Sequence, residues 1–473
     1  MAATTSPTTA VPGPRAPLLG WRGQAIRFLR DPVAFMQALY REHGRVAASA
    51  AGRPLWMFGF GAPYNQLVLS DAARFHSVPI APLGTPPGSA LARLTYNLLS
   101  MNGDIHRQQR RLALPAFHRR RVEGYRDEMV AIAERELAGW QPGQRRDIAR
   151  AMQRLTLSIA SWTLFGVDAT ADADSVGALI QRWMQLVESG AVFLLPKDLP
   201  ATPMRRLLRA SDELETRIRG LIAQKRANLA ARGDVLSMLI QARDDDGTAM
   251  TDSELIGQTA MLFVAGHETS SNALTWTLFL LSQHPGVLAD RQDELRGVLH
   301  GAAPAVEQLG RLPLLERVVK ESLRLLPPAP FQMRYSAAAV QFGPYSVPAG
   351  ATITLSSYIT HRLPEIYPEP LRFLPERWER IDPSVYEYMP FGAGSHMCLG
   401  STFALMEIKI VLAMILQRFR LELLPGARVD RRVTITMGPR HGMPMALLPA
   451  DAAPRPGTVR GNIREMVDLA SPR

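Results

Sequence analysis

The chain contains one cysteine, Cys398, in the glycine-rich segment FGAGSHMCLG at residues 391–400. A lone cysteine is most often a small buried apolar residue, but the surroundings of this one favour chemistry. Gly392, Gly394 and Gly400 allow the backbone to approach a bound group closely. A helix is predicted to begin directly after Cys398, so free N–H groups and the positive end of the helix dipole would face the sulfur and favour the thiolate.

A thiolate without a second cysteine has two remaining uses, as a nucleophile or as a metal ligand. A nucleophile needs a histidine base, and His396, two residues away, would point to the opposite face of an extended loop. Axial ligation of haem iron fits better. The glycines would let the backbone lie against a flat macrocycle, and the amides at the helix start could hydrogen-bond the sulfur.

The same segment resembles the haem-binding signature of the cytochrome P-450 superfamily, Phe-x-x-Gly-x-x-x-Cys-x-Gly. Phe391, Gly394, Cys398 and Gly400 match every fixed position. The resemblance covers roughly residues 12–449. Within the superfamily, the chain resembles the soluble bacterial members. It implies a haem-thiolate monooxygenase with haem b (iron protoporphyrin IX) as its cofactor and Cys398 as the axial iron ligand.

An acid and an alcohol lie inside an apolar helical segment, in the sequence AGHETS at residues 265–270. The ordinary structural interpretation is a Thr269 hydroxyl bonded to a carbonyl one turn earlier and a Glu268 in a buried salt bridge. The resemblance implies catalytic roles instead, with Thr269 hydrogen-bonding dioxygen and Glu268 relaying protons. An apolar pocket cannot supply protons without such a relay. Gly266 indicates that something packs closely against this helix.

Glu321 and Arg324 are three residues apart and face the same side of a predicted helix. They could be an ordinary surface pair, stabilising by a few tenths of a kcal/mol. The resemblance implies that both join Arg377 in a buried network that holds the cysteine loop, a structural role. Trp378 stands where the family more often has Phe, which we interpret as a tolerated exchange.

Haem carries two propionates, which need cationic or N–H donors wherever they are buried. The resemblance assigns this task to four residues: His106, Arg110, Arg334 and His396. His106 and Arg110 are one helical turn apart. His396 replaces the commoner Arg of the signature, so its charge is expected to vary with pH.

The residues expected to line the substrate pocket are apolar or small: Leu262, Ala265, Gly266, Phe331 and Met437. They predict an apolar substrate, and terpenoid, steroid, fatty-acyl and polyketide-like molecules are all compatible. A same-fold alternative is a haem-thiolate enzyme for peroxide-driven oxidation, coupling or rearrangement, which the Glu268–Thr269 pair disfavours. A haem-binding sensor without turnover is disfavoured on the same ground.

Electrons must come from outside the chain, because it shows no Gly-rich dinucleotide-binding fingerprint. We expect a ferredoxin or flavodoxin-type donor with its reductase, docked on a basic surface that includes Arg107 and Arg111. Lys and Arg number 54 against 43 Asp and Glu, a net charge of +11. The cations are scattered and no nucleic-acid recognition motif appears, so no nucleic-acid partner is expected.

The composition predicts a globular protein, with 47% hydrophobic and 21% charged residues. A single cysteine excludes a disulfide framework and fits a reducing compartment. No apolar run approaches the roughly 20 residues of a membrane span, and no signal-peptide pattern is present. These features predict a cytoplasmic monomer without a membrane span.

The elements that must position these residues are mostly helical, so we predict an α+β fold, mostly α, with one P-450-type domain at 18–449. Thr251 and Glu254 have capping-box spacing and begin a central helix of about 30 residues, stopped by Pro285-Gly286. Further helices are expected at 285–299, 313–326 and 400–418.

The β regions are expected to be small. They comprise a hairpin at 45–60, antiparallel strands at 341–354 around a turn at 348–350, and strands near 421–424, 433–437 and 445–448. Residues 79–89 are a predicted loop. Residues 1–17 are expected to form a disordered arm, and residues 450–473 a peripheral tail.

Overall fold

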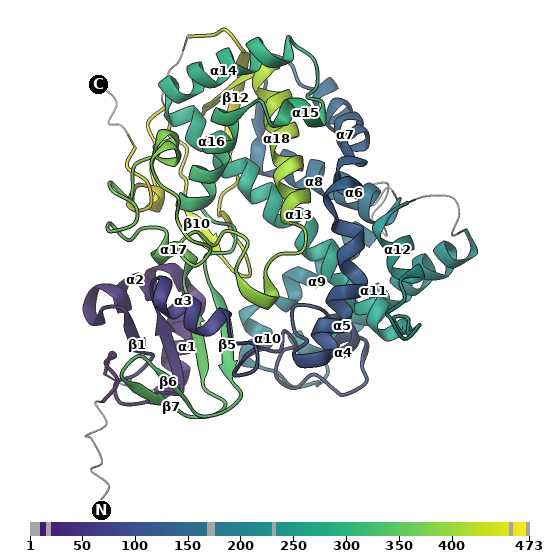
Figure 1. The fold of residues 1–473 in the computed structure, drawn as a ribbon, viewed down its shortest axis with the longest axis vertical. Helices are drawn as coiled ribbons and strands as arrows, with labels where there is room; N and C mark the ends of the chain where they lie inside the picture. The colour runs from purple at the N-terminus through teal and green to yellow at the C-terminus, as the bar shows by residue number, and fades with distance from the viewer. Residues whose placement is uncertain (1–9, 16–19, 168–175, 229–232, 454–456, 470–473) are drawn as a thin grey trace, which may run out of the picture.

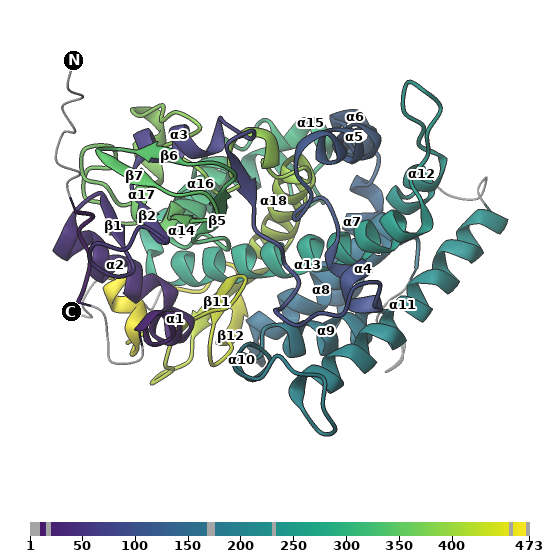
Figure 2. The same ribbon diagram turned by 90° about the horizontal axis from the view of Figure 1, so that it is seen from below.

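Helix α13 (Asp252–Gln283) runs through the centre of the molecule and confirms the predicted central helix (Figures 1 and 2). The computed structural model describes residues 10–15, 20–167, 176–228, 233–453 and 457–469. Thr251 and Glu254 form a capping box at the start of α13. Its residues are buried around most of the circumference, so the helix is held by packing on all sides.

The helices that pack most extensively against α13 are α4 (Ala90–Thr95), α8 (Ile148–Phe165), α16 (Pro313–Leu325) and α18 (Ser401–Arg418). Two glycines of α13 make the close crossings possible. A Cβ on Gly257 would lie 2.1 Å from the carbonyl oxygen of Tyr96, and one on Gly266 would lie 3.0 Å from Leu164. The sequence expectation of a close neighbour at Gly266 is therefore confirmed, and the neighbour is α8.

The remaining helices surround this centre: α1 (Gly20–Arg30), α2 (Pro32–His43), α3 (Ala62–Leu69), α5 (Gly103–Ala113), α6 (Arg119–Glu123), α7 (Arg126–Ala138), α9 (Val176–Val187), α10 (Gly190–Leu194), α11 (Pro203–Ala227), α12 (Val235–Gln241), α14 (Pro285–Leu299), α15 (Val306–Leu309) and α17 (Ser357–Thr360). The helices predicted at 285–299, 313–326 and 400–418 correspond to α14, α16 and α18. None of the helices in the described ranges is long and apolar enough to cross a membrane.

The largest sheet has the strand order β1-β2-β8-β5-β3 and lies with α1, α2 and α3 at one end of the molecule (Figure 1). Its strands are β1 (Val46–Ala48), β2 (Trp56–Gly59), β8 (Thr352–Leu355), β5 (Gln332–Ser336) and β3 (Phe75–Ser77). Only β2 and β8 pair in parallel. The hairpin predicted at 45–60 is β1–β2.

Three smaller sheets complete the β structure. They are the pair β6 (Val340–Phe342) and β7 (Tyr345–Val347), the three-stranded β4 (Arg145–Asp147), β12 (Pro444–Pro449) and β9 (Phe419–Leu423), and the pair β10 (Arg431–Val433) and β11 (Met437–Pro439). Together with the helices they form a single α+β domain that is mostly helical, as predicted.

Two β predictions were wrong in detail. The chain turns at 348–350 as expected, where the Ala351 amide donates to the Pro348 carbonyl at 3.4 Å, but the strands on either side do not pair with each other. The antiparallel pair is β6–β7, which turns at Gly343-Pro344, where Gly343 adopts φ +63°. The following strand, β8, leaves this pair and joins β2 and β5. The single strand expected at 433–437 is a hairpin, because the chain turns at 434–436 between β10 and β11.

The two terminal segments pack more closely than their composition indicates. In the segment expected as an arm, Val11 is buried, its carbonyl accepts from the Gly52 amide at 2.9 Å, and the Pro12 carbonyl accepts from Ala48 at 2.8 Å. Although proline lacks an N–H, its carbonyl oxygen can still accept a hydrogen bond, as that of Pro12 does here. Residues 1–9 and 16–17 lie outside the described residues.

The expected peripheral tail contributes five buried side chains to the main core: Val459, Ile463, Met466, Val467 and Leu469. Its apolar residues recur at spacings of three and four, so one side of a short irregular segment faces the core. The Pro- and Arg-rich residues before them hide this pattern. The tail is therefore part of the domain core and does not lie at its periphery.

Candidate active site

The loop that carries Cys398 is closed by its own backbone. The Cys398 amide donates to the carbonyl of Phe391 at 2.8 Å, and the Met397 amide donates to that of Gly394 at 3.1 Å. Gly394 has φ +71°, and a Cβ there would lie 1.9 Å from the carbonyl oxygen of Leu69 in α3. Only glycine fits this position, because any side chain would displace α3 or the loop.

The thiol of Cys398 is accessible to solvent, but protein atoms surround it densely. This burial raises the pKa of Cys398 above its ordinary value, while a hydrogen bond from the Gly400 amide and the charge of Arg110 lower it. The sequence predicted that the helix start would favour the thiolate. The predicted influence is present, but burial outweighs it. A coordinated metal ion removes the proton of a thiol outright, so iron would restore the thiolate.

The four residues expected to hold propionates come together beside the cysteine loop. The imidazole rings of His106 (α5) and His396 stack with centroids 3.9 Å apart. Arg110 and Arg334 (β5) lie close enough for their charges to lower the pKa of both histidines. Ser77 in β3 contacts the His396 Nδ1 at 3.3 Å. Elements distant in sequence thus form one cationic cluster.

No carboxylate pairs with this cluster among the described residues. Arg334 is 8% exposed and bonds only neutral groups, donating to the Met333 carbonyl at 2.8 Å and to the Gln332 side-chain oxygen at 3.4 Å. Nε2 of His106 is buried without a hydrogen-bond partner. Buried cations are normally paired, so the cluster fits a ligand that brings its own negative charges.

Burial sets the protonation of this cluster. Burial, together with the charges of the neighbouring arginines, lowers the pKa of His106 to about 4 and that of His396 to about 3. Burial also lowers the pKa of Arg334 to about 10. An added dianion would raise all of these pKa values, because opposite charge favours the protonated form.

The middle of α13 is partly open to solvent. Ala265 is exposed, although most of the helix is buried. One turn later, the Thr269 hydroxyl donates to the Ala265 carbonyl at 2.8 Å. This back-bond is the ordinary structural interpretation given above. It also places the hydroxyl beside Ala265, the most exposed residue of the AGHETS segment.

Glu268 makes no salt bridge with any residue that the structure describes, so the expected buried salt bridge is not seen there. Its Oε1 accepts from the Thr436 hydroxyl at 2.8 Å, and Asn272 donates to that hydroxyl at 3.1 Å. Its Oε2 is buried without a partner. A buried carboxyl oxygen without a hydrogen bond is costly, which is typical of a group kept for chemistry.

The expected pocket residues do not all face open space. Ala265 is exposed, and Phe331 is half-buried with its ring edge against Phe28. Leu262 is buried, and Gly266 faces α8. Met437 is fully buried, and its carbonyl accepts from the Trp276 indole at 3.0 Å. Met437 is therefore packed in the core, whereas Gly266 has its Cβ position against α8 but is itself half-buried beside Ala265.

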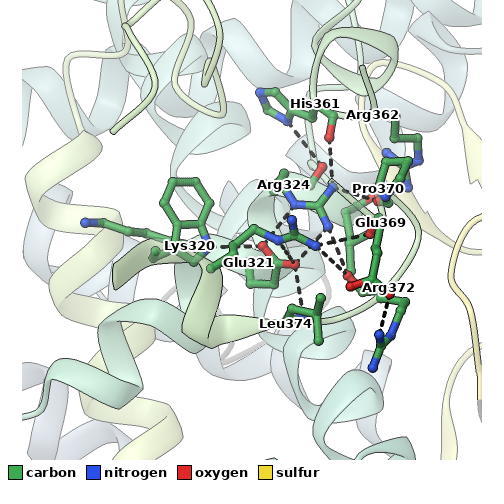
Figure 3. Close-up of polar contacts among 12 residues, drawn as sticks. Lys320, Glu321, Arg324, His361, Arg362, Glu369, Pro370, Arg372 and Leu374 are labelled. Atoms are coloured by element: carbon green, nitrogen blue, oxygen red, sulfur yellow. Dashed lines mark hydrogen bonds and ion pairs between the residues drawn. The ribbon is translucent and has the colours of Figure 1, made fainter. Parts of the chain in front are cut away.

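Glu321 lies at the centre of the predicted structural network, shown in Figure 3. It accepts from Arg324 at 2.8 and 2.9 Å, from Nε of Arg377 at 2.9 Å and from the Leu374 amide at 3.0 Å. The indole N–H of Trp378 donates to its second oxygen at 3.0 Å. The Trp at 378 therefore adds a hydrogen bond that Phe would lack, which sequence reasoning missed.

This network reaches the cysteine loop through His361. The His361 ring is fully buried, bonds the Arg324 carbonyl at 3.2 Å and accepts from the Met389 amide at 2.8 Å. Met389 in turn accepts from Gly392 within the loop. Burial lowers the pKa of His361 to about 3, so the ring is neutral and can accept from the amide. The network thus holds the start of the loop, as the resemblance implied.

Taken together, these features fit haem. The loop supplies one sulfur ligand, glycine lets the backbone pack tightly, and the buried cations lack the two negative charges that propionates carry. The family model described as Cytochrome P450 matches residues 11–442. In Streptomyces melanosporofaciens, cyclooctatin synthase is 32% identical over 89% of this chain and 93% of its own length.

Two further matches extend the comparison. Cyclooctat-9-en-7-ol 5-monooxygenase of the same organism is 35% identical over 71% of this chain and 74% of its own length. The solved structure of a cyanobacterial protein, CYP120A1 with bound retinoic acid, has a TM-score of 0.80 and 26% identity. That match covers 93% of this chain and 99% of the other.

Proposed function

The chain belongs to the cytochrome P450 family and is a haem-dependent P450 monooxygenase, and we propose that its substrate is an apolar terpenoid. One oxygen atom of O2 enters the substrate and the other leaves as water. The observation that carries the proposal is the acid–alcohol pair Glu268–Thr269, beside the exposed Ala265 in the middle of a buried helix.

Each residue of the site then has a task. Bound haem supplies the iron at which O2 is activated, with the Cys398 sulfur donating electron density to it. His106, Arg110, Arg334 and His396 would hold the propionates by hydrogen bonds, which are charge-assisted for the two arginines. The Thr269 hydroxyl, which donates to the Ala265 carbonyl in this structure, would act as a proton donor on this side of the site, and Glu268 would resupply its proton.

The substrate class rests on the lining and on the relatives. Ala265 and Phe331 present apolar surface, and an apolar lining selects hydrocarbon skeletons. The name of one relative specifies a cyclooctatenol substrate, and a solved structure of the fold holds retinoic acid. Both molecules are largely hydrocarbon with one oxygen-bearing group. A role in secondary metabolism follows for this chain.

The electron donor is proposed to be a small acidic ferredoxin or flavodoxin that docks near α5 and α6. The short segment before α6 lies against the cysteine loop, since a Cβ on Gly400 would be 3.9 Å from the Phe117 ring. Arg107 and Arg111, the residues expected on this surface, already pair with Asp104 and Asp244.

Two other exposed arginines fit the docking role better. Arg120 and Arg121 have no ion pair among the described residues, and both line a cavity of about 870 Å³ on this surface. Charges without intrachain partners attract an acidic protein most strongly.

The test uses purified protein reconstituted with haem. The reduced carbon monoxide complex should show the red-shifted Soret band of thiolate ligation, and Cys398→Ser should lose it. Terpene alcohols are then screened for a shift of the Soret band. Product should require O2, NADPH, a ferredoxin and its reductase. Turnover with peroxide alone and none with O2 would favour the peroxide-driven alternative, and absence of the thiolate band would overturn the assignment of Cys398.

A further inference from the structure

Five large apolar side chains on three neighbouring segments are open to solvent. Three lie in α10 and the link from α10 to α11, one in the loop predicted at 79–89, and one in the turn between β10 and β11. These side chains, called the apolar patch below, are between 45% and 69% exposed: Leu83, Leu194, Leu195, Leu199 and Ile435. Single exposed apolar residues are common, but several on adjoining segments mark a binding surface.

Contacts between the three segments bring the apolar patch together. A Cβ on Gly84 would lie 2.2 Å from the carbonyl oxygen of Pro196, so the 79–89 loop packs directly on the link after α10. Arg432 in β10 has a guanidinium nitrogen 3.8 Å from the carboxylate of Glu188, two residues before α10. The exposed side chains therefore belong to neighbouring parts of one surface.

The link between α10 and α11 is an ordered loop that presents its leucines outward. The Thr202 hydroxyl can donate to the Leu199 carbonyl at 2.7 Å, and the Leu199 amide donates to the same hydroxyl oxygen at 3.3 Å. Ala201 adopts φ +63°, a left-handed conformation that alanine rarely takes. A loop that keeps this strain while it exposes leucine is typical of a binding segment.

Cations without carboxylate partners border the apolar patch. Lys197 stands between the exposed leucines, and Arg206 and Arg209 lie one turn apart on the exposed side of α11. None of the three forms an ion pair within the part of the chain that the structure describes, and Asp198 pairs with Arg205 at 2.6 Å instead. Exposed leucines beside free cations are complementary to a surface that is anionic outside and apolar beneath.

We propose that the apolar patch docks on an anionic lipid surface. Its side chains enter the boundary between headgroups and acyl chains, and Lys197, Arg206 and Arg209 contact the lipid phosphates. Helix α10 has five residues, far fewer than a membrane span needs, so the protein lies on the lipid surface and does not cross it.

This orientation suits the rest of the molecule. In Figure 2, α10 lies at the lower edge, whereas α5 and α6 lie at the upper edge, so the proposed electron-donor surface stays free. The turn that carries Ile435 also contacts the site, because the Thr436 hydroxyl donates to Glu268 at 2.8 Å. Apolar molecules dissolve in a bilayer, so docking brings the proposed terpenoid substrate close to the site. Only this last consequence rests on the proposed function.

A second copy of this chain is the other occupant that an apolar patch could accept. In a two-fold contact each patch would meet its own cations, because both copies use the same surface. Like charges oppose that contact, whereas anionic lipid offers the opposite charge. Sedimentation velocity should therefore find a monomer. A dimer that Leu194→Gln dissociates would overturn the lipid assignment.

Vesicle sedimentation with the haem-loaded protein measures the docking directly. Phosphatidylcholine vesicles that contain about 30% phosphatidylglycerol should bind the wild type, and added salt should weaken this binding. Vesicles of phosphatidylcholine alone should bind it about tenfold more weakly, because they lack the negative charge. No binding to the anionic vesicles at low salt would overturn the proposal.

One pair of variants tests the apolar contribution. Leu194→Gln with Leu199→Gln should weaken binding to the anionic vesicles about tenfold, because membrane affinity scales with the apolar area that is buried. The control is Leu55→Gln, a leucine 65% exposed between β1 and β2, which should bind as the wild type does. Equal loss in the variant and the control would mean unspecific adhesion and contradict docking by the apolar patch.

A second pair tests the cations. Lys197→Glu with Arg206→Glu should weaken binding about tenfold or more at low salt. Arg41→Glu with Arg53→Glu makes the same change of net charge at exposed positions near the β1–β2 hairpin and should have a much smaller effect. Equal effects would show that overall charge, rather than this surface, attracts the vesicles.

Fluorescence tests whether the side chains enter the lipid. The added emission of Leu194→Trp should be quenched by lipids brominated in the upper acyl chain, and that of Leu55→Trp should not. Absence of quenching in both would contradict insertion. These measurements need no turnover, so lost vesicle binding overturns the docking alone. Absence of O2-dependent product would instead overturn the proposed function and leave the vesicle result standing.

Discussion

At the residue scale, two side chains around Glu321 show what single groups contribute. Trp378 was interpreted from the sequence as a tolerated exchange for Phe, yet its indole N–H donates to a fully buried carboxylate. His361 belongs to none of the motifs described above, yet its ring connects Arg324 to Met389 at the start of the cysteine loop. A motif shows which residue types occur together in the sequence. It does not show which unused hydrogen-bond donor contacts which oxygen atom in the folded protein.

Trp378→Phe should destabilise the protein by about 2 kcal/mol, because it removes one hydrogen bond to a charged group. Arg324, Arg377 and Leu374 still hold Glu321, so haem binding and the thiolate band should persist. Urea unfolding of wild type and variant measures the difference. Loss of haem from the variant at unchanged stability would show that Trp378 does more than donate this bond.

His361 makes stability depend on pH. Its pKa falls from 6.5 unfolded to about 3 folded, because burial disfavours the charged ring. The unfolded state therefore binds the extra proton below pH 6.5, and stability is lost as the pH falls. At pH 5 this histidine should cost about 2 kcal/mol relative to pH 7.

The matched variant is His361→Gln, which can still accept from Met389 and donate to Arg324. It should be less stable than the wild type at pH 7 but lose less stability between pH 7 and 5. His106 and His396 make the same contribution to the pH dependence of stability in the wild type and in the variant. They therefore do not affect the difference between the two profiles. Parallel pH profiles from urea unfolding would disprove the assignment to His361.

At the scale of elements, glycines determine how closely the loop and α3 approach. Gly394→Ala places a Cβ against the Leu69 carbonyl in a backbone that alanine also disfavours. Gly88→Ala is the control, because Gly88 has the similar φ of +69° but nothing within 4 Å of the added atom. The control should cost about 1 kcal/mol from backbone strain alone.

Gly394→Ala should therefore lose far more than Gly88→Ala, and with it most haem binding. The ratio of Soret to protein absorbance measures haem content, and thermal unfolding measures stability. Equal effects of the two substitutions would mean that the contact with Leu69 relaxes at little cost.

The elements also show how far sequence reasoning extends. The capping box of α13 and the proline-bounded helices were predicted correctly, because caps and prolines act locally. The turn at Gly343 and the buried tail were not, since β pairing and burial depend on distant partners. In the candidate site, the motifs predicted which residues meet. They did not reveal that Met437 is fully buried or that the Cβ position of Gly266 faces α8.

At the scale of the whole molecule, some positive charges form ion pairs within the chain and others do not. Many arginines are paired within the chain, as Arg107 and Arg111 are, so the net charge overstates what a partner encounters. Arg120→Glu with Arg121→Glu should slow reduction by an acidic ferredoxin about tenfold at low salt and weaken its dependence on ionic strength. Stopped-flow reduction under carbon monoxide measures the rate.

The control reverses two exposed arginines near the β1–β2 hairpin, Arg41 and Arg53, at the far end of the molecule (Figure 1). This pair has the same change of net charge and should leave the rate nearly unaltered. Equal slowing by both pairs would show that overall charge, not a docking site, controls reduction. A slower rate with undiminished salt dependence would contradict docking at Arg120 and Arg121.

The buried tail has a consequence for biosynthesis. Val459, Ile463, Met466, Val467 and Leu469 complete the main core, so the nascent polypeptide cannot finish folding until these codons have been translated. Cys398 leaves the ribosome earlier, while that part of the interior is still open. Any fusion partner or affinity tag has to begin beyond Leu469, and a stop codon at position 450 should yield an aggregating product rather than a trimmed enzyme.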